Sequence, residues 1–243
     1  MDTIKIDKKN VLMVAHRGLS GIETENTNLA FVAAGNRSYY GIETDVHFTA
    51  DGNFVIIHDN VTGRVSREAN LEVEKTDYET LRSVKLADRE DGATRQDIMI
   101  PDLDDYFKIC RRYGKVCVLE IKNTMTHEML ERIVAAAEAR EYLENVIFIS
   151  FTLQNLLILR EITPENQRIQ LLCGELDDAT IDYLAEKRID IDIHYPTLFA
   201  HPEYMEKFRA HGLKVNCWTC DNPADAEKLI GMGVDFITSN ILE

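Results

Sequence analysis

The sequence predicts a (β/α)8 TIM barrel, the α/β fold in which eight parallel strands alternate with helices around a closed ring. Eight short apolar runs of strand length occur along the chain, and segments with helical spacing separate most of them. The chain has 243 residues, of which 45% are hydrophobic, and this length is typical of one barrel. We therefore expect a single barrel domain over residues 1–243.

The apolar runs give the expected order of the barrel strands. They lie at residues 11–16, 41–48, 116–121, 146–150, 169–173, 189–193, 214–219 and 236–238. After the first run, Asn26 or Thr27 can cap a helix through its side-chain oxygen. Segments such as MLERIVAAAEAR and PADAEKLIGMG place apolar residues at helical spacing between later runs. Alternation of this kind is what a parallel barrel requires.

A further apolar run, at residues 54–57, does not belong to the barrel count. It follows an Asp51-Gly52 turn, and so short a turn returns the chain antiparallel to residues 41–48. We therefore expect an extra β-hairpin after the second strand, at the rim that the carboxyl ends of the strands form.

The charged segment that follows is expected to form a small loop or cap insertion over residues 59–100. Within it, residues 87–97 (ADREDGATRQD) read as a surface loop. Pro101 is then expected to open the next helix, with Asp102 near the positive end of the helix dipole.

The charge and the cysteine content limit the classes of partner. The formal net charge is −15 and no basic stretch is present, so nucleic acid is not expected as a partner. The apolar run VLMVA is too short for a signal peptide or a membrane span, which predicts a cytoplasmic protein without stable membrane insertion. Five cysteines, an odd number, predict reduced thiols. Cys217 and Cys220 would face opposite sides of a strand, so we expect two unrelated buried thiols. The oligomeric state stays open.

Charged residues on the apolar strands indicate a site. Barrels of this kind build their active sites at the carboxyl ends of the strands, where His16, Glu43 and Glu120 fall. Glu43 and Asp45 are two apart and face the same way, as do Glu120 and Lys122. Such carboxylates could bind one hard cation, Mg²⁺ or Ca²⁺, or could instead form a structural network with nearby basic groups.

The same positions resemble the glycerophosphodiester phosphodiesterase family. The resemblance rests on an ordered set of motifs over nearly the whole chain: HRG at 16–18, ENT at 25–27, ETDV at 43–46, the DG turn, HD at 58–59, LEIK at 119–122, Ser150-Phe151, Trp218-Thr219 and GVDFITSN at 233–240. One departure is Thr24, which stands where the family has a proline.

The resemblance implies metal-dependent hydrolysis of small glycerophosphodiesters to glycerol 3-phosphate and an alcohol. It assigns Glu43, Asp45 and Glu120 to one divalent cation, and His16 and His58 to general acid and base catalysis, in an order left open. We further expect Arg17 and Lys122 to hold phosphate oxygens, and Trp218 to form a wall of the substrate pocket. Arg17 could instead be anchored by Glu25.

Three alternatives to this function are considered. A related barrel phosphodiesterase could cleave intact phospholipids, in a phospholipase D-like or phosphoinositide-cleaving reaction, although no amphipathic segment favours it. A catalytically silent homologue could bind ligands only, but such a protein has no physical reason to retain costly buried charges. A metal-independent sugar-phosphate isomerase-type barrel would be insensitive to chelators.

Overall fold

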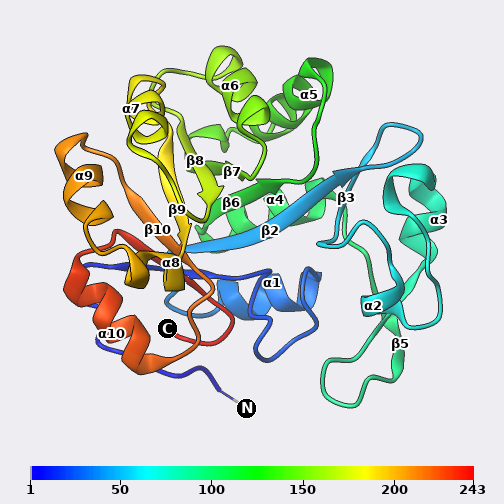
Figure 1. The fold of residues 1–243 in the computed structure, drawn as a ribbon. Helices are drawn as coiled ribbons and strands as arrows, with labels where there is room; N and C mark the ends of the chain where they lie inside the picture. Colours follow the sequence, from blue (N-terminus) through cyan, green and yellow to red (C-terminus); the bar gives the residue numbers. More distant parts are fainter. Residues whose placement is uncertain (1) are drawn as a thin grey trace.

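The structure, a computed structural model that describes residues 2–243, is organised around a closed ring of eight parallel strands (Figure 1). Around the ring the strands follow the order β1, β2, β6, β7, β8, β9, β10 and β11, and the pairing of β11 with β1 closes the barrel. Their bounds are β1 Leu12–Ala15, β2 Gly41–Phe48, β6 Val116–Ile121, β7 Val146–Ser150, β8 Arg168–Cys173, β9 Asp190–His194, β10 Val215–Trp218 and β11 Phe236–Ser239. The predicted (β/α)8 TIM barrel is confirmed.

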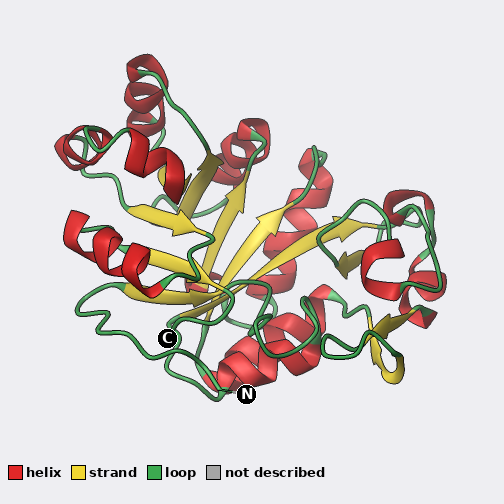
Figure 2. Cartoon of the chain, turned by 60° about the horizontal axis from the view of Figure 1, so that its bottom comes forward, coloured by secondary structure: helices red, strands yellow, loops and turns green. Residues whose placement is uncertain are grey.

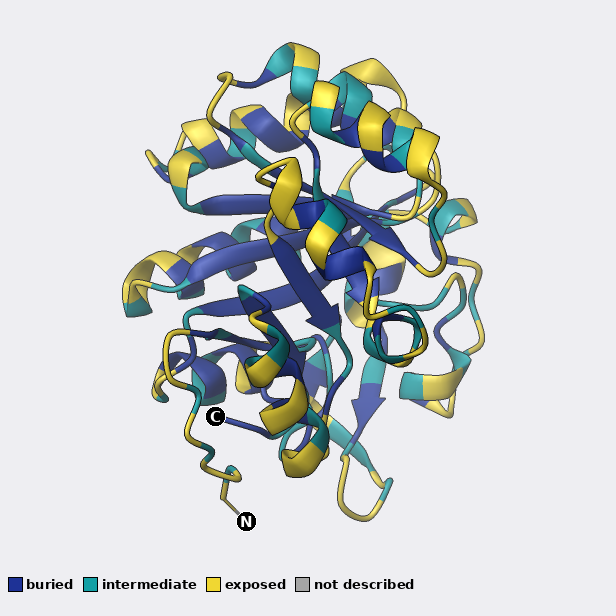
Figure 3. Cartoon of the chain, turned by 60° about the vertical axis from the view of Figure 1, so that its left-hand side comes forward, coloured by how far each residue is buried: buried dark blue, intermediate teal, exposed yellow. Residues whose placement is uncertain are grey.

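Helices cover the outside of the ring, and the strands between them are buried (Figure 3). The helices that follow barrel strands are α1 Asn28–Gly35, α4 Leu103–Tyr113, α5 His127–Glu138, α6 Leu153–Ile162, α7 Asp178–Glu186, α8 Tyr195–Ala200, α9 Tyr204–Ala210 and α10 Pro223–Met232, with a 3₁₀ turn, η2, at Leu143–Asn145. None of the helices in residues 2–243 combines the length and the apolar character needed to cross a bilayer.

The inside of the ring changes character along its axis. Because side chains alternate along each strand, every second residue points inward. Val14, Val118, Ile147 and Phe236 fill the interior as one apolar cluster. Toward the carboxyl ends of the strands the inward positions become polar and charged, as at Glu43. The fold therefore places ionisable side chains at the carboxyl ends of the strands, next to the apolar cluster inside the barrel.

The segment after β2 forms a separate body beside the barrel, on the right in Figures 1 and 2. Strand β3 runs antiparallel to the end of β2. The segment then contains a short two-stranded sheet and its own apolar cluster, which includes Leu81 and Ile98. Its elements are β3 Phe54–Ile56, α2 Gly63–Ser66, η1 Val73–Lys75, α3 Tyr78–Ser83, β4 Lys85–Ala87 and β5 Thr94–Met99.

Three local expectations need correction. Residues 94–97 were expected in a surface loop but belong to β5, which pairs with β4; the segment has no apolar alternation because only Ile98 of β5 is buried. Helix α4 is opened by Asp102, whose side chain accepts the Asp105 N–H, and Pro101 lies before it. Strand β10 ends before Cys220, so strand parity does not apply to that residue; all five cysteines are buried and free.

A buried carboxylate joins the two ends of the described chain. The side chain of Glu243 accepts hydrogen bonds from the Thr3 hydroxyl at 2.6 Å and from the Ser38 N–H at 2.5 Å, and pairs with Lys5 at 2.6 Å. Burial opposes ionisation, but Lys5, Thr3 and Ser38 outweigh it and lower the pKa of Glu243 from its ordinary 4.5 to about 2. This group therefore stabilises the fold in its charged form.

We expect Glu243→Gln to reduce the free energy of unfolding at pH 7 by about 1–2 kcal/mol. The pKa of Glu243 is about 2 in the folded protein and has its ordinary value of 4.5 in the unfolded chain. The extra free energy of unfolding of the wild type is therefore fully present above pH 4.5 and disappears as the pH falls toward 2. Urea unfolding of both proteins at several pH values measures the difference. A difference that stays constant between pH 7 and pH 3 would contradict this role of Glu243.

Candidate active site

Three carboxylates meet at the carboxyl ends of two neighbouring barrel strands. Glu43 and Asp45 lie on β2 and Glu120 lies on β6, where Asp45 is the register partner of Glu120. One oxygen from each lies within 4.8 Å of the others, and all three residues are buried. Strand parity explains the convergence, because the three residues occupy inward positions of paired strands. The structure brings together the ligands that the sequence predicts.

Burial and the neighbouring charges act differently on the pKa values of the three carboxyl groups. Burial, together with the charges of Asp45 and Glu120, raises the pKa of Glu43 well above its ordinary value. Burial and the charge of Asp45 raise the pKa of Glu120 to about 7. Asp45 differs: burial would raise its pKa, but Arg17 and Lys122 hold it below its usual range. The protein alone therefore does not favour ionisation of all three carboxylates.

The residues present fit a divalent cation. The Oδ1 atom of Asp45 is buried and has no hydrogen-bond partner, which is costly unless a ligand occupies that position. Its other oxygen, Oδ2, accepts a hydrogen bond from Asn26 at 2.7 Å, which fixes the carboxylate. An all-oxygen donor set is the one that Mg²⁺ and Ca²⁺ prefer. Within residues 2–243, Asp45 therefore has one oxygen held by a hydrogen bond and one, 3.5 Å from the Lys122 ammonium, that has no hydrogen-bond partner.

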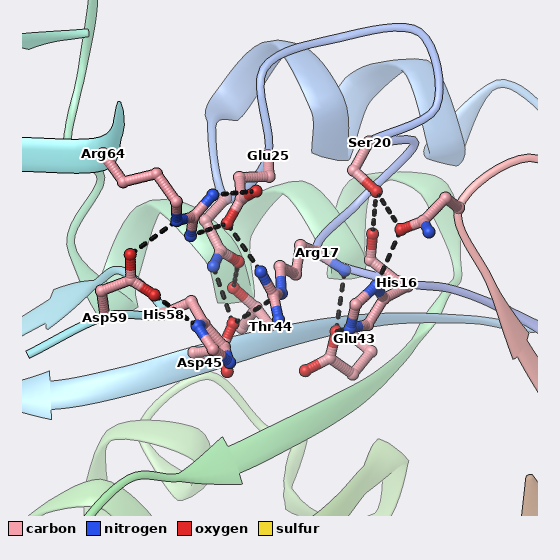
Figure 4. Close-up of polar contacts among 12 residues, drawn as sticks. His16, Arg17, Ser20, Glu25, Glu43, Thr44, Asp45, His58, Asp59 and Arg64 are labelled. Atoms are coloured by element: carbon pink, nitrogen blue, oxygen red, sulfur yellow. Dashed lines mark hydrogen bonds and ion pairs between the residues drawn. The ribbon is translucent and has the colours of Figure 1, made fainter. Parts of the chain in front are cut away.

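Two basic side chains border the cluster. The Nζ atom of Lys122 lies 2.7 Å from Glu120 Oε1 and 3.5 Å from Asp45 Oδ1. Arg17 contacts Glu25 at 2.8 Å and Asp45 at 3.6 Å, and its backbone N–H donates to Glu43 at 2.7 Å (Figure 4). Lys122 pairs with the carboxylates and Arg17 with Glu25, which are the alternatives to phosphate binding that the sequence left open. The phosphate-binding roles of Lys122 and Arg17 stay predictions.

A chain of polar side chains from the loops after β1, β10 and β11 holds His16. The amide nitrogen of Asn240 donates to Asp221 at 2.5 Å, so its carbonyl oxygen faces His16 Nδ1 at 2.7 Å. The Ser20 hydroxyl donates to the same oxygen at 2.6 Å. These contacts place the proton on Nδ1 and leave Nε2 facing Glu43 at 4.0 Å. Burial, and then Arg17, lower the pKa of His16 to about 4, so the imidazole is neutral.

His58 follows β3 and is held in a similar way. Its Nδ1 donates to Asp59 at 2.7 Å, and Asp59 pairs with Arg64 of α2 at 2.6 Å (Figure 4). The same guanidinium donates to both oxygens of Glu25 at 2.8 Å. Burial lowers the pKa of His58, and Arg17 lowers it further, while Asp45 and Asp59 oppose the shift. Arg64 therefore links Asp59, which holds His58, to Glu25, which holds Arg17.

Both histidines line one pocket together with Glu43 and Glu120. Trp218, the only tryptophan, lies on the opposite side of that pocket and is partly exposed. His47, which shares the parity of Asp45, is fully buried and contacts Glu74 at 3.2 Å instead of the cluster.

Several polar residues at the site were not identified from the sequence. Asn26 was considered only as a helix cap, but Thr27 caps α1 and Asn26 binds Asp45. Asp59 directly follows His58 and could have been found as its orienting carboxylate. Asn240 ends the GVDFITSN motif, but its contact with His16 depends on closure of the barrel. Arg64 carries no local signal, because its contacts depend on the path of the insertion.

Fold and site together define a class: a TIM barrel whose carboxyl-end mouth combines a carboxylate cluster with two oriented imidazoles. The model of the glycerophosphoryl diester phosphodiesterase family matches residues 16–242. The chain belongs to this family, and it is an enzyme of the phosphoric diester hydrolase class.

Relatives and solved structures agree with this assignment. The chain is 31% identical to a glycerophosphodiester phosphodiesterase of Caldanaerobacter subterraneus, over 94% of this chain and 93% of the relative. The structure resembles a glycerophosphodiester phosphodiesterase of Parabacteroides distasonis with a TM-score of 0.80 and 26% identity, covering 95% and 93% of the two chains. It also resembles an Oleispira antarctica phosphodiesterase solved with the product sn-glycerol-3-phosphate, with a TM-score of 0.84 and 22% identity over 98% and 96%.

The cluster predicts how the protein responds to divalent ions. Adding Mg²⁺ or Ca²⁺ to chelator-treated protein is expected to raise the Tm, since an ion at about 100 times its Kd adds about 2.7 kcal/mol. Glu43→Gln should raise the Tm of the metal-free protein at neutral pH, because it removes a carboxyl group whose ionisation the fold opposes. The same variant should abolish most of the ion-induced increase. Differential scanning calorimetry measures both.

Glu227→Gln is the matched control, because Glu227 is exposed on α10 and makes no ion pair in the described chain. It should leave the ion-induced increase unchanged. An undiminished increase in Glu43→Gln would show that the ion binds elsewhere.

Proposed function

We propose that this enzyme hydrolyses glycerophosphodiesters to glycerol 3-phosphate and an alcohol, using one divalent cation, Mg²⁺ or Ca²⁺, and two histidines. The observation that carries the proposal is the position of His16 and His58, which line one pocket with Glu43 and Glu120 and have Nδ1 occupied by protein partners. The family supports the same reaction class, and the Caldanaerobacter relative carries the name of this activity.

The carboxylates and the basic groups prepare the site for a phosphate ester. Glu43, Asp45 and Glu120 would hold the cation, and Lys122 would leave its carboxylate contacts to neutralise charge on a non-bridging phosphate oxygen. When bound, the cation supplies Lewis-acid stabilisation of the phosphoryl oxygens. Arg17 keeps its side chain on Glu25 and its backbone N–H on Glu43, which fixes the direction of that carboxylate.

The two imidazoles would divide the proton transfers. Cleavage requires one group to remove a proton from the attacking oxygen and another to protonate the departing alkoxide. In both His16 and His58 the Nδ1 position is occupied, so Nε2 is the atom that exchanges the proton. Asn240 and Asp59 act as positioning residues, because each fixes the orientation of one ring. The same pair serves whether the attacking oxygen comes from water or from the neighbouring glycerol hydroxyl.

Substitution of either histidine tests the acid-base roles. We expect His16→Ala and His58→Ala each to lower kcat by roughly 100-fold or more, in the range usual for loss of a general acid or base. Release of glycerol 3-phosphate from glycerophosphocholine measures the rate, and circular dichroism checks the fold.

His211→Ala is the control, because His211 lies on the surface at the end of α9, paired with Asp182. It should keep wild-type activity. Full activity in either active-site variant would refute the assignment.

The competing function is cleavage of intact phospholipids. Side chains such as Ile149 and Leu172 line the pocket, and the sequence has no amphipathic segment for docking on a lipid bilayer. We expect glycerophosphocholine to be hydrolysed and vesicles of the parent phosphatidylcholine not to be, in parallel assays at equal phosphodiester concentration. Faster turnover of the vesicles would favour the phospholipase-type alternative.

A further inference from the structure

The second barrel strand carries a buried histidine that the proposed chemistry does not use. His47 is fully buried and shares the parity of Glu43 and Asp45. The pairing of β2 with β6 ends at Val46, whereas His47 pairs with Val55 of β3 (Figure 1). His47 therefore lies where β2 leaves the ring and meets the insertion, and its side chain contacts that insertion instead of the carboxylate cluster.

Both ring nitrogens of His47 have partners. Nε2 lies 3.3 Å from the backbone oxygen of His58, and this oxygen can only accept, so Nε2 is the donor. Nδ1 lies 3.2 Å from Oε1 of Glu74, which belongs to η1 of the insertion. A proton must lie between these two atoms, because two lone pairs would repel each other at that distance. Hydrogen bonds at both nitrogens therefore fix the His47 ring.

Glu74 is itself fixed to the barrel. Its Oε1 atom also accepts a hydrogen bond from the side-chain amide of Asn123 at 2.7 Å, and the same amide donates to Asn60 at 3.0 Å. Asn123 follows β6, and its backbone oxygen accepts a hydrogen bond from the buried Asn155 of α6 at 2.6 Å. A chain of polar side chains from α6 and the loop after β6 thus holds Glu74 and Asn60 against the barrel.

The backbone of His58 depends on the contact with His47. The residue before it, Ile57, is still tied to β2, because its N–H donates to the backbone oxygen of Asp45 at 3.1 Å. Beyond Ile57 the chain leaves the sheet. Within residues 2–243, the hydrogen bond from His47 is the one that holds the His58 backbone. Asp59 binds the His58 ring, so the two supports act on different parts of the same residue.

We propose that His47 is a positioning residue for the reaction, which sets the distance of the His58 imidazole from the phosphate ester by holding the His58 backbone. The inference rests on the proposed function, in which His58 transfers a proton, and adds a residue on which that transfer depends. A displacement of about 1 Å in a reacting group can lower a rate by about 100-fold. The contact acts on kcat rather than on KM, because His47 lies outside both the carboxylate cluster and the pocket lining.

Removal and restoration of the hydrogen-bond donor test the proposal. His47→Leu has no donor, and it should lower kcat for glycerophosphocholine by roughly 10- to 100-fold while KM stays within about two-fold of the wild type. His47→Gln can present an amide N–H to the same oxygen and should recover most of kcat. A kcat of His47→Leu within about two-fold of the wild type, or a kcat of His47→Gln no higher than that of His47→Leu, would overturn the proposal.

The matched control is His127→Leu, which makes the same exchange at an exposed position of α5 and should keep the wild-type kcat. Because a substitution in the buried position can impair folding, Glu74→Ala is made as well. Glu74 is partly exposed, and its loss frees one nitrogen of the His47 ring, so kcat should fall here too. A wild-type kcat in Glu74→Ala would contradict the proposal even if His47→Leu does not fold.

Failure of the proposed function has a different signature, because wild-type protein then releases no glycerol 3-phosphate. The contact is in that case tested without turnover by NMR of the histidine ring nitrogens, in which His58→Ala identifies the His58 signals. His47→Leu should shift these signals, and His47→Gln should return them toward their wild-type positions. Unshifted His58 signals in His47→Leu would refute the positioning role independently of activity.

Discussion

The active site depends on three carboxylates that the barrel buries close together, although burial and mutual repulsion oppose their ionisation. Glu43, Asp45 and Glu120 are brought within 4.8 Å by the register of β2 and β6, and the protein only partly offsets the resulting charge. Arg17 and Lys122 favour ionised Asp45, whereas the pKa values of Glu43 and Glu120 are raised. A site of this kind is costly to the apo fold, and an apolar barrel interior beneath it provides the rigid support that keeps the groups together.

Hydrogen bonds orient the two histidines at the mouth of the barrel. Each histidine has one nitrogen bound by a polar partner, and each partner is held in turn: Asn240 by Asp221, and Asp59 by Arg64. The supports of His16 lie after β10 and β11, at the other end of the chain, whereas the supports of His58 follow it directly in the insertion. On the opposite side of the pocket, aromatic rings and a buried carboxyl group are part of the lining.

Much of this arrangement follows from local sequence patterns. Alternation of short apolar runs with helical segments identified the barrel, and strand parity placed Glu43 with Asp45 and Glu120 with Lys122 before any coordinates. Strand β5 was not identified, because it buries little apolar surface and depends on its pairing with β4. The burial of Asp192 near Glu120 was not predictable either, because the two residues lie on separate strands, β9 and β6, that only the closed barrel brings to one pocket.

The most direct measurement is a crystal structure of the protein soaked with glycerol 3-phosphate and Ca²⁺ or Mg²⁺. The account predicts one ion with oxygens of Glu43, Asp45 and Glu120 at about 2.0–2.6 Å, and the phosphate between the ion and the two imidazoles. It also predicts that Lys122 moves from Glu120 toward the phosphate. An ion bound elsewhere, or a phosphate held away from His16 and His58 while Lys122 keeps its present contacts, would contradict the account.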